Sequence, residues 1–138
     1  MVQRTPIMLA VVFLAAVTAA VANATSPMAN GRAIFLTGRD LAGRPIGAQR
    51  APMRSSCAAC HRADGSGGVH LPGGAVSADL RHAALVTHQK HPYTLALLER
   101  AISTGVDNEG KTLHPMMPHW RLSKTDLHDV AAYVQTLK

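Results

Sequence analysis

The chain has 138 residues, of which 47% are hydrophobic and 16% are charged, so it can form one small globular domain and is too short for a two-domain enzyme. Basic residues outnumber acidic residues by 14 to 8, which gives a net charge of +6 with neutral histidine. Only five residues are aromatic, so an ordinary aromatic-rich core is not available and something else has to fill the centre.

The N-terminal residues show the three parts of a secretory signal peptide. Met1–Arg4 is a short positive segment, Ile7–Ala22 is almost entirely apolar, and Ala22-Asn23-Ala24 offers a small-x-small cleavage pattern. An uncleaved membrane anchor is the alternative, but the apolar stretch is shorter than the roughly 20 residues that a spanning helix needs. We therefore expect export to the periplasm, removal of residues 1–24, no stable membrane span afterwards, and one domain over residues 25–138.

A first helix is predicted at about Asn30–Thr37. Its Gly31 permits close approach of another helix, and its Phe35 can pack near Tyr133. The stretch that follows, Gly38–Ser56, contains several glycines and prolines and predicts a basic surface flap or a small hairpin.

Most of the net positive charge lies in residues 31–62, where six arginines meet one acidic residue. In residues 63–138, seven basic residues meet seven acidic ones. The basic region has neither a recognition-helix pattern nor a platform of aromatic residues, so nucleic acid is not an expected partner. Electrostatic steering of an acidic partner protein is the simpler interpretation. We expect the docking face near Arg44, Arg50 and Arg54.

Both cysteines fall in one pentapeptide, Cys57-Ala58-Ala59-Cys60-His61, which has the spacing that covalent attachment of a c-type haem requires. The two thiols can add to the two vinyl groups of the porphyrin, because one helical turn brings both sulfur atoms under the same edge of the ring. His61 can then supply an imidazole nitrogen to the iron as the proximal axial ligand. The motif therefore predicts one haem c, attached through Cys57 and Cys60.

Three other interpretations of the cysteines are weaker. A redox-active Cys-x-x-Cys pair lies beside a βαβ pattern, which this sequence lacks. A structural zinc site needs four ligands, and no second Cys or His pair with compatible spacing follows. A disulfide between Cys57 and Cys60 would close so short a loop that it would stabilise the fold only slightly.

The stretch Arg62–Arg81 contains five glycines and a proline, so we expect an irregular loop that can approach a flat ligand closely. It has no nucleotide-binding fingerprint, because its glycines neither follow a strand pattern nor open a predicted helix. A further helix is predicted over about Pro92–Thr104, with Gly105 after its end. Beyond it, Asp107 and Glu109 are expected to be solvated.

The segment Leu113-His114-Pro115-Met116-Met117-Pro118-His119-Trp120 holds the candidate ligands for the distal side of an iron. Its prolines make it too irregular for a helix interior. A methionine ligand favours reduced iron and raises the reduction potential, whereas a second histidine lowers it. Trp120 is expected in the haem cavity or in the core. The candidate ligands are Met117, Met116, His114 and His119.

The C-terminal segment predicts the clearest helix. Ser123 and Asp126 form an S-x-x-D capping pattern, and the apolar residues that follow fall on one face. We expect this face to pack against the first helix. The apolar residues are Leu127, Val130, Ala131, Val134 and Leu137.

The order of these features, from the signal peptide through CAACH to HPMMPHW and a terminal helix, resembles small monohaem cytochromes c of class I. The resemblance covers about Gly31 to Leu137. It implies an all-α cytochrome c fold, with three to four short helices wrapped around one covalently bound haem. It also implies Met117 as the distal ligand, since the ligand methionine of this family commonly precedes a proline. Finally, it implies that Pro72 presents its carbonyl to the proximal imidazole.

The expected function is transfer of single electrons through a His/Met-ligated haem between a donor dehydrogenase and an acceptor oxidase or cytochrome, without catalysis by the protein itself. Two alternatives stay open. One is a haem enzyme or small-ligand sensor with a displaceable distal ligand, in which His114 or His119 acts as an acid–base group. The other is the cytochrome subunit of a membrane-associated dehydrogenase complex.

Overall fold

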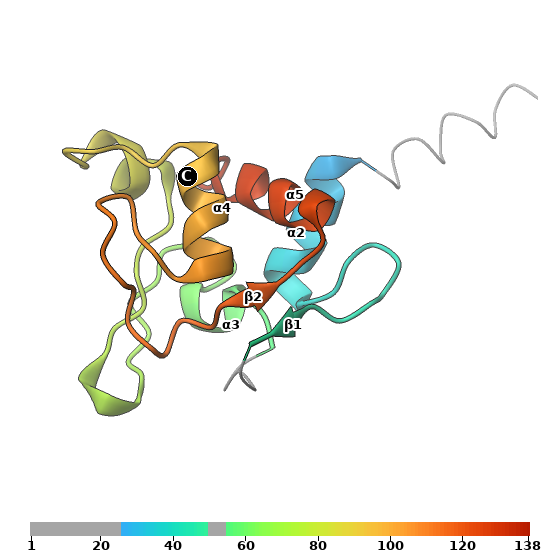
Figure 1. Cartoon of the computed structure of the whole chain (residues 1–138), viewed down its shortest axis with the longest axis horizontal. Coiled ribbons are helices and arrows are strands. Elements are labelled where there is room, and N and C mark those ends of the chain that lie inside the picture. The colour runs from blue at the N-terminus through green and yellow to red at the C-terminus, as the bar shows by residue number, and fades with distance from the viewer. Residues whose placement is uncertain (1–25, 50–54) are drawn as a thin grey trace, which may run out of the picture.

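The computed structural model describes residues 26–49 and 55–138. The predicted signal peptide and two of the arginines assigned to the docking face, Arg50 and Arg54, lie outside these ranges. The described chain is mostly helical, which confirms the predicted fold class apart from one short pair of strands (Figure 1). In chain order the elements are α2 (Pro27–Thr37), β1 (Gly47–Ala48), α3 (Ala58–His61), the turns η1 (Pro72–Gly74) and η2 (Ala83–Thr87), α4 (Leu95–Thr104), β2 (Trp120–Arg121) and α5 (Lys124–Val134).

Helices α2 and α5 pack directly against each other at Gly31. A Cβ atom on Gly31 would fall 2.0 Å from the backbone oxygen of Asp129 and 2.9 Å from Cβ of Tyr133, so only glycine permits this approach. One turn further along α2, Phe35 meets Tyr133 with ring centroids 5.5 Å apart. The predicted pairing of the first and last helices is therefore confirmed.

The boundaries of two helices follow from their caps. Helix α2 begins at Pro27, earlier than predicted, because the Ser26 hydroxyl accepts a hydrogen bond from the backbone N–H of Ala29. Helix α5 begins where the sequence predicts, with the Ser123 hydroxyl accepting from the N–H of Asp126.

Helix α4 begins at Leu95, so the predicted start at Pro92 is wrong. The N-cap is Thr94, whose hydroxyl accepts a hydrogen bond from the N–H of Leu97. Pro92 lies two residues before this cap and is therefore outside the helix. The predicted end is correct: Gly105 adopts a left-handed conformation with φ 67° and closes the last turn.

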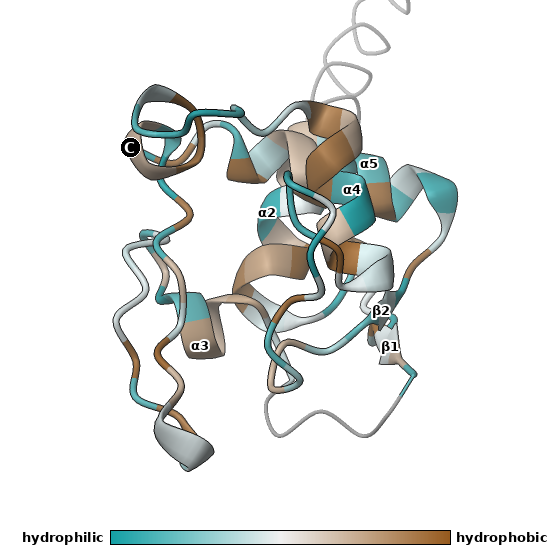
Figure 2. Cartoon of the chain, turned by 60° about the vertical axis from the view of Figure 1, so that its left-hand side comes forward, coloured by the Kyte–Doolittle hydropathy of each residue, from teal (hydrophilic) through white to brown (hydrophobic). Residues whose placement is uncertain are grey.

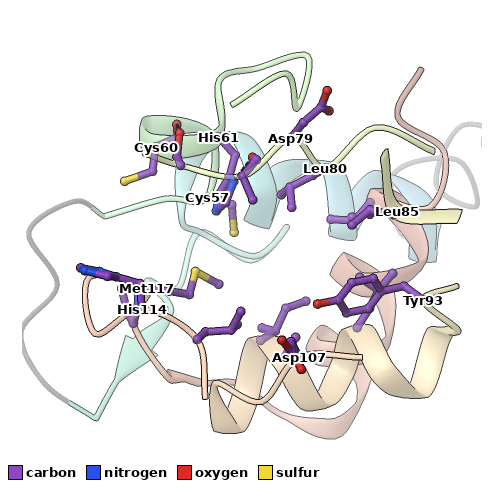
Figure 3. A pocket seen from close by; sticks show the side chains of 18 of the residues that line it. Cys57, Cys60, His61, Asp79, Leu80, Leu85, Tyr93, Asp107, His114 and Met117 are labelled. Carbon is purple, nitrogen blue, oxygen red and sulfur yellow. Dashed lines mark hydrogen bonds between the residues drawn. The ribbon is translucent and has the colours of Figure 1, made fainter. Parts of the chain in front are cut away.

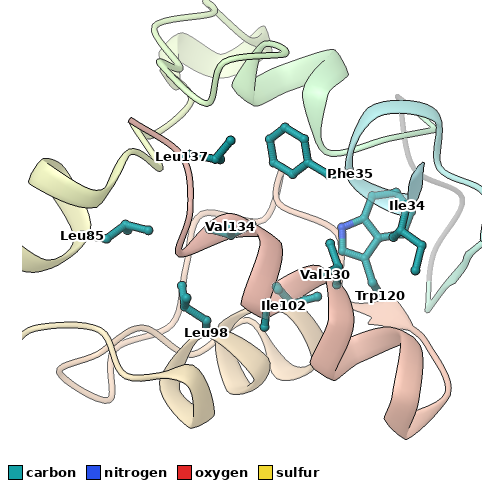
Figure 4. Close-up of a cluster of buried hydrophobic side chains, with 10 residues drawn as sticks. Ile34, Phe35, Leu85, Leu98, Ile102, Trp120, Val130, Val134 and Leu137 are labelled. Carbon is teal, nitrogen blue, oxygen red and sulfur yellow. The ribbon is translucent and has the colours of Figure 1, made fainter. Parts of the chain in front are cut away.

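The hydrophobic core lies between α2, α4 and α5, with further contributions from η2, β2 and the chain after α5 (Figure 4). Phe35 and Trp120 are its large aromatic members, and α5 contributes one apolar face. The buried set is Ile34, Phe35, Leu85, Leu98, Ile102, Trp120, Val130, Ala131, Val134 and Leu137.

The described part of the predicted flap is a loop that is closed at two points. Arg39 pairs with Pro45 in an isolated antiparallel bridge, and β1 then pairs antiparallel with β2, Gly47 opposite Arg121 and Ala48 opposite Trp120. The strand partner thus comes from the far end of the chain. No helix in the described ranges is long and apolar enough to cross a membrane.

Candidate functional site

A cavity of about 510 Å³ opens between α3, the loop after it, α4 and the segment before β2. Its walls are mostly apolar. In Figure 2, hydrophobic residues (brown) lie on the non-helical chain as well as on the helices. The volume lies within the range of pockets that hold a cofactor-sized molecule. In Figure 3, Cys57 and His61 lie on one side of this cavity and Met117 lies on the other.

The single turn of α3 places both cysteines at the cavity. Cys57 and Cys60 line its wall and are not joined by a disulfide. Burial raises the pKa of the Cys57 thiol to about 12, so this cysteine is protonated at neutral pH. A reactive dithiol needs the opposite shift, because the thiolate is the nucleophile. The shift at Cys57 is opposite to the one that activates a redox-active cysteine.

His61 is held in one tautomer by a backbone carbonyl. Its Nδ1 lies 2.8 Å from the oxygen of Ala78, and a carbonyl oxygen can only accept, so Nδ1 carries the proton and donates. Burial lowers the pKa of the ring despite this hydrogen bond, which keeps the imidazole neutral at neutral pH. The second ring nitrogen is left with a lone pair that can bind a metal.

The predicted role of Pro72 is wrong. The carbonyl that meets His61 belongs to Ala78, six residues later in the chain. Pro72 is exposed in η1, beyond the bridge between His70 and Val76. That bridge makes η1 the tip of a projecting loop, so the chain has to return past the tip before it reaches the histidine.

The distal segment brings two methionines to the cavity. Met116 and Met117 both line it, and His114 lies at its exposed edge (Figure 3). A hydrogen bond of 2.9 Å from the N–H of Met117 to the oxygen of His114 closes the turn that carries them. His114 also accepts a hydrogen bond on Nδ1 from the N–H of Met116.

His119 and Trp120 occupy different positions beside this turn. The His119 ring packs against Gly105, where a Cβ atom would fall 2.2 Å from its Nε2. His119 is not among the residues that line the cavity. Trp120 is 4% exposed and belongs to both the cavity wall and the core.

Sequence reasoning missed two parts of the site. Asp107, expected to be solvated, lines the cavity, and its Oδ1 accepts from the backbone N–H groups of Glu109 and Lys111. Ala78 was missed because it acts through its backbone carbonyl, a group that every residue has. The glycine-rich composition of its loop was the only available signal, and it does not point to one residue.

Two cysteines and a histidine on one helical turn, at the wall of an apolar cavity, define a protein that binds haem covalently. The family model described as Cytochrome c matches residues 28–138, and the chain belongs to the cytochrome c family. No curated protein and no solved structure gives a significant match. The protein is thus a haem-binding electron-transfer protein, with haem c attached through Cys57 and Cys60.

Proposed function

We propose that this protein is a one-electron carrier of the periplasm in which His61 and Met117 are the axial ligands of the iron. One observation carries the proposal: these two side chains, far apart in the sequence, line the same cavity from opposite sides (Figure 3). The bound haem supplies an iron that gains and loses one electron.

The residues of the chain have separate tasks in this function. The two cysteines fix the porphyrin, and neutral His61 offers its second ring nitrogen while Ala78 holds the first. The thioether of Met117 favours the reduced iron. The apolar wall excludes water and disfavours the additional charge of the oxidised iron, which also raises the reduction potential.

Three other distal residues were candidates, and their surroundings support Met117. His119 packs against Gly105 and is absent from the cavity lining. His114 is exposed, and its Nδ1 is engaged by the backbone of its own turn. Met116 lies beside Met117, and two adjacent residues cannot both direct their sulfur atoms at one iron. Met116 instead packs in the wall, a common role for methionine.

Replacement of the distal ligand tests the proposal. We expect Met117→Ala to abolish the near-infrared charge-transfer band of the methionine–iron bond, to lower the reduction potential and to let the reduced protein bind carbon monoxide. The matched control is Met116→Ala, which removes the neighbouring thioether and should retain the band. Visible and near-infrared spectroscopy, redox titration and carbon monoxide binding measure these effects.

Two results would overturn the assignment. A band that survives in Met117→Ala and disappears in Met116→Ala would move the ligand to Met116. A wild-type protein that lacks the band and binds carbon monoxide would favour an enzyme or a small-ligand sensor. Co-purification with a larger redox subunit would instead identify the chain as part of a dehydrogenase complex.

Export and an acidic redox partner belong to the same proposal. The N-terminal sequence supports cleavage after Ala24, which N-terminal sequencing of the haem-loaded protein tests. The excess of arginine in residues 31–62 supports docking to a partner with an acidic face.

A further inference from the structure

The carbonyl that orients His61 comes from a segment with little regular structure. Between Arg62 and Ala78 the short turn η1 is the only helical element of the described chain, and the remaining shape depends on isolated hydrogen bonds. Five glycines in this loop have positive φ, a conformation that side chains rarely adopt. Apart from the isolated bridge between His70 and Val76, the described loop has no regular element that would hold Ala78 against the histidine ring.

Ser77, the residue before Ala78, connects this loop to α3. Its hydroxyl donates to the backbone oxygen of Cys60 over 2.8 Å, so it reaches a carbonyl in the last turn of α3. The same hydroxyl accepts from the N–H of Val69 over 2.9 Å. One side chain thereby joins the haem-binding helix to both arms of the loop.

The backbone of Ser77 is engaged as well. Its N–H donates to the oxygen of Val69 over 3.0 Å, and its oxygen accepts from the N–H of Gly68 over 2.9 Å. Ser77 is 9% exposed, so its polar groups depend on these partners instead of water. Removal of the hydroxyl would leave the Val69 N–H without its acceptor in a partly buried place.

The space behind the Ala78 carbonyl is closed by Gly67. A Cβ atom on Gly67 would fall 2.3 Å from that oxygen, and the N–H of Gly67 donates to the backbone oxygen of His61 over 3.0 Å. The carbonyl is therefore held between the loop backbone and the histidine ring.

We propose that Ser77 is a positioning residue for the proximal ligand: its hydroxyl ties α3 to the loop and so fixes the Ala78 carbonyl on Nδ1 of His61. The proposal rests on His61 as the axial ligand, as given in the proposed function. A hydrogen bond at Nδ1 makes the imidazole a stronger donor, which stabilises the oxidised iron. Loss of the Ser77 hydroxyl should therefore raise the reduction potential.

The experiment compares Ser77→Ala with Ser66→Ala in the haem-loaded protein. Ser66 is the matched control, because its hydroxyl lies in the same loop but donates to Asp64 and does not reach α3. We expect a more positive reduction potential in Ser77→Ala only. We also expect the His61 ring Nδ1–H of the reduced protein to exchange with solvent roughly five- to tenfold faster, as loss of one net hydrogen bond implies.

Each result decides the question. Equal potentials and exchange rates in the two variants, with histidine-ligated iron in both, would overturn the role of Ser77 and leave the proposed function standing. A wild-type spectrum without histidine ligation would overturn the proposed function itself.

If Ser77→Ala does not accumulate with haem, the wild-type exchange rates decide. Opening of the Ser77 hydrogen bonds releases the Val69 N–H directly and frees the Ala78 carbonyl from Nδ1 of His61. The His61 Nδ1–H and the Val69 N–H should therefore become accessible at the same rate. A ring proton that exchanges much faster than a protected Val69 amide would overturn the proposal.

Discussion

The carboxylate of Asp79 follows directly after the carbonyl that meets His61, and it is paired with a neighbour in the same loop. Arg81 donates to Asp79 from Nε over 3.0 Å and from its terminal nitrogen over 2.6 Å, and its backbone N–H adds a third donor. These hydrogen bonds hold the pKa of the Asp79 carboxyl below its ordinary value of 3.8. The pair lies immediately beyond Ala78 in the chain.

The lowered pKa of Asp79 predicts a dependence of stability on pH. The ionised carboxylate makes its full contribution to the free energy of unfolding above the pKa of Asp79 in the unfolded chain, near 3.8. This contribution is lost as pH falls through the lower pKa of the folded protein. We expect Asp79→Asn to lower the free energy of unfolding at neutral pH by no more than about 1 kcal/mol, because the pair is partly exposed. Denaturant titrations at pH 7 and at several values below pH 4 measure the difference between variant and wild type. A difference that stayed constant down to pH 2 would contradict this account.

Among the described elements, α2 and α5 share the most extensive contact. Gly31 brings the two backbones together, and the Asn30 amide donates to the carboxylates of Asp126 and Asp129 over 2.9 Å in each case. Asp129 is 4% exposed, so its carboxylate is buried in this contact. The contact between α2 and α5 therefore combines close backbone packing with side-chain hydrogen bonds.

We expect Gly31→Ala to destabilise the protein although alanine is the better helix former by about 1 kcal/mol. The new methyl group would meet the backbone of Asp129 at 2.0 Å, and overpacking of this kind costs about 1–3 kcal/mol. Thermal unfolding of the haem-loaded protein measures the effect. Arg32→Ala, at the exposed neighbouring position, is the control and should change the midpoint little. Equal midpoints for the two variants would show that the helices can separate without cost.

At the scale of the whole molecule, charge is distributed unevenly along the chain. The basic excess of residues 31–62 contrasts with the neutral balance of residues 63–138. Within the described chain, Arg44 forms an ion pair with Asp40 at 2.6 Å, although its side chain stays 75% exposed. Arg44 can therefore still face a partner, but Asp40 offsets part of its charge.

This asymmetry predicts the salt dependence of electron transfer with the natural donor. Replacement of Arg44, Arg50 and Arg54 by glutamine should slow association at low ionic strength by about tenfold and flatten its dependence on salt. The control replaces Lys90, Lys111 and Lys124 by glutamine as well. This removes the same amount of charge from residues 63–138, where basic and acidic residues balance. Stopped-flow reduction at several ionic strengths measures both. An unchanged salt dependence in the arginine variant would contradict the assigned docking face.

The sequence by itself determined the features that depend on neighbours in the chain. The CAACH pentapeptide carries its chemistry within five residues, and the caps at Ser123 and Gly105 act within one helical turn. Gly31 was also predictable, because a glycine in an amphipathic helix marks a close contact. His61 and Met117 as axial ligands stay predictions.

Only the tertiary structure decided which distant groups meet. It showed that Ala78 and not Pro72 accepts from His61, that β1 pairs with β2, and that Asp107 lines the cavity. The physical reason is the same in each case. These contacts depend on where a loop turns back, which residue type does not reveal. For Ala78 and the two strands the partner is also a backbone carbonyl or N–H, which nearly every residue carries.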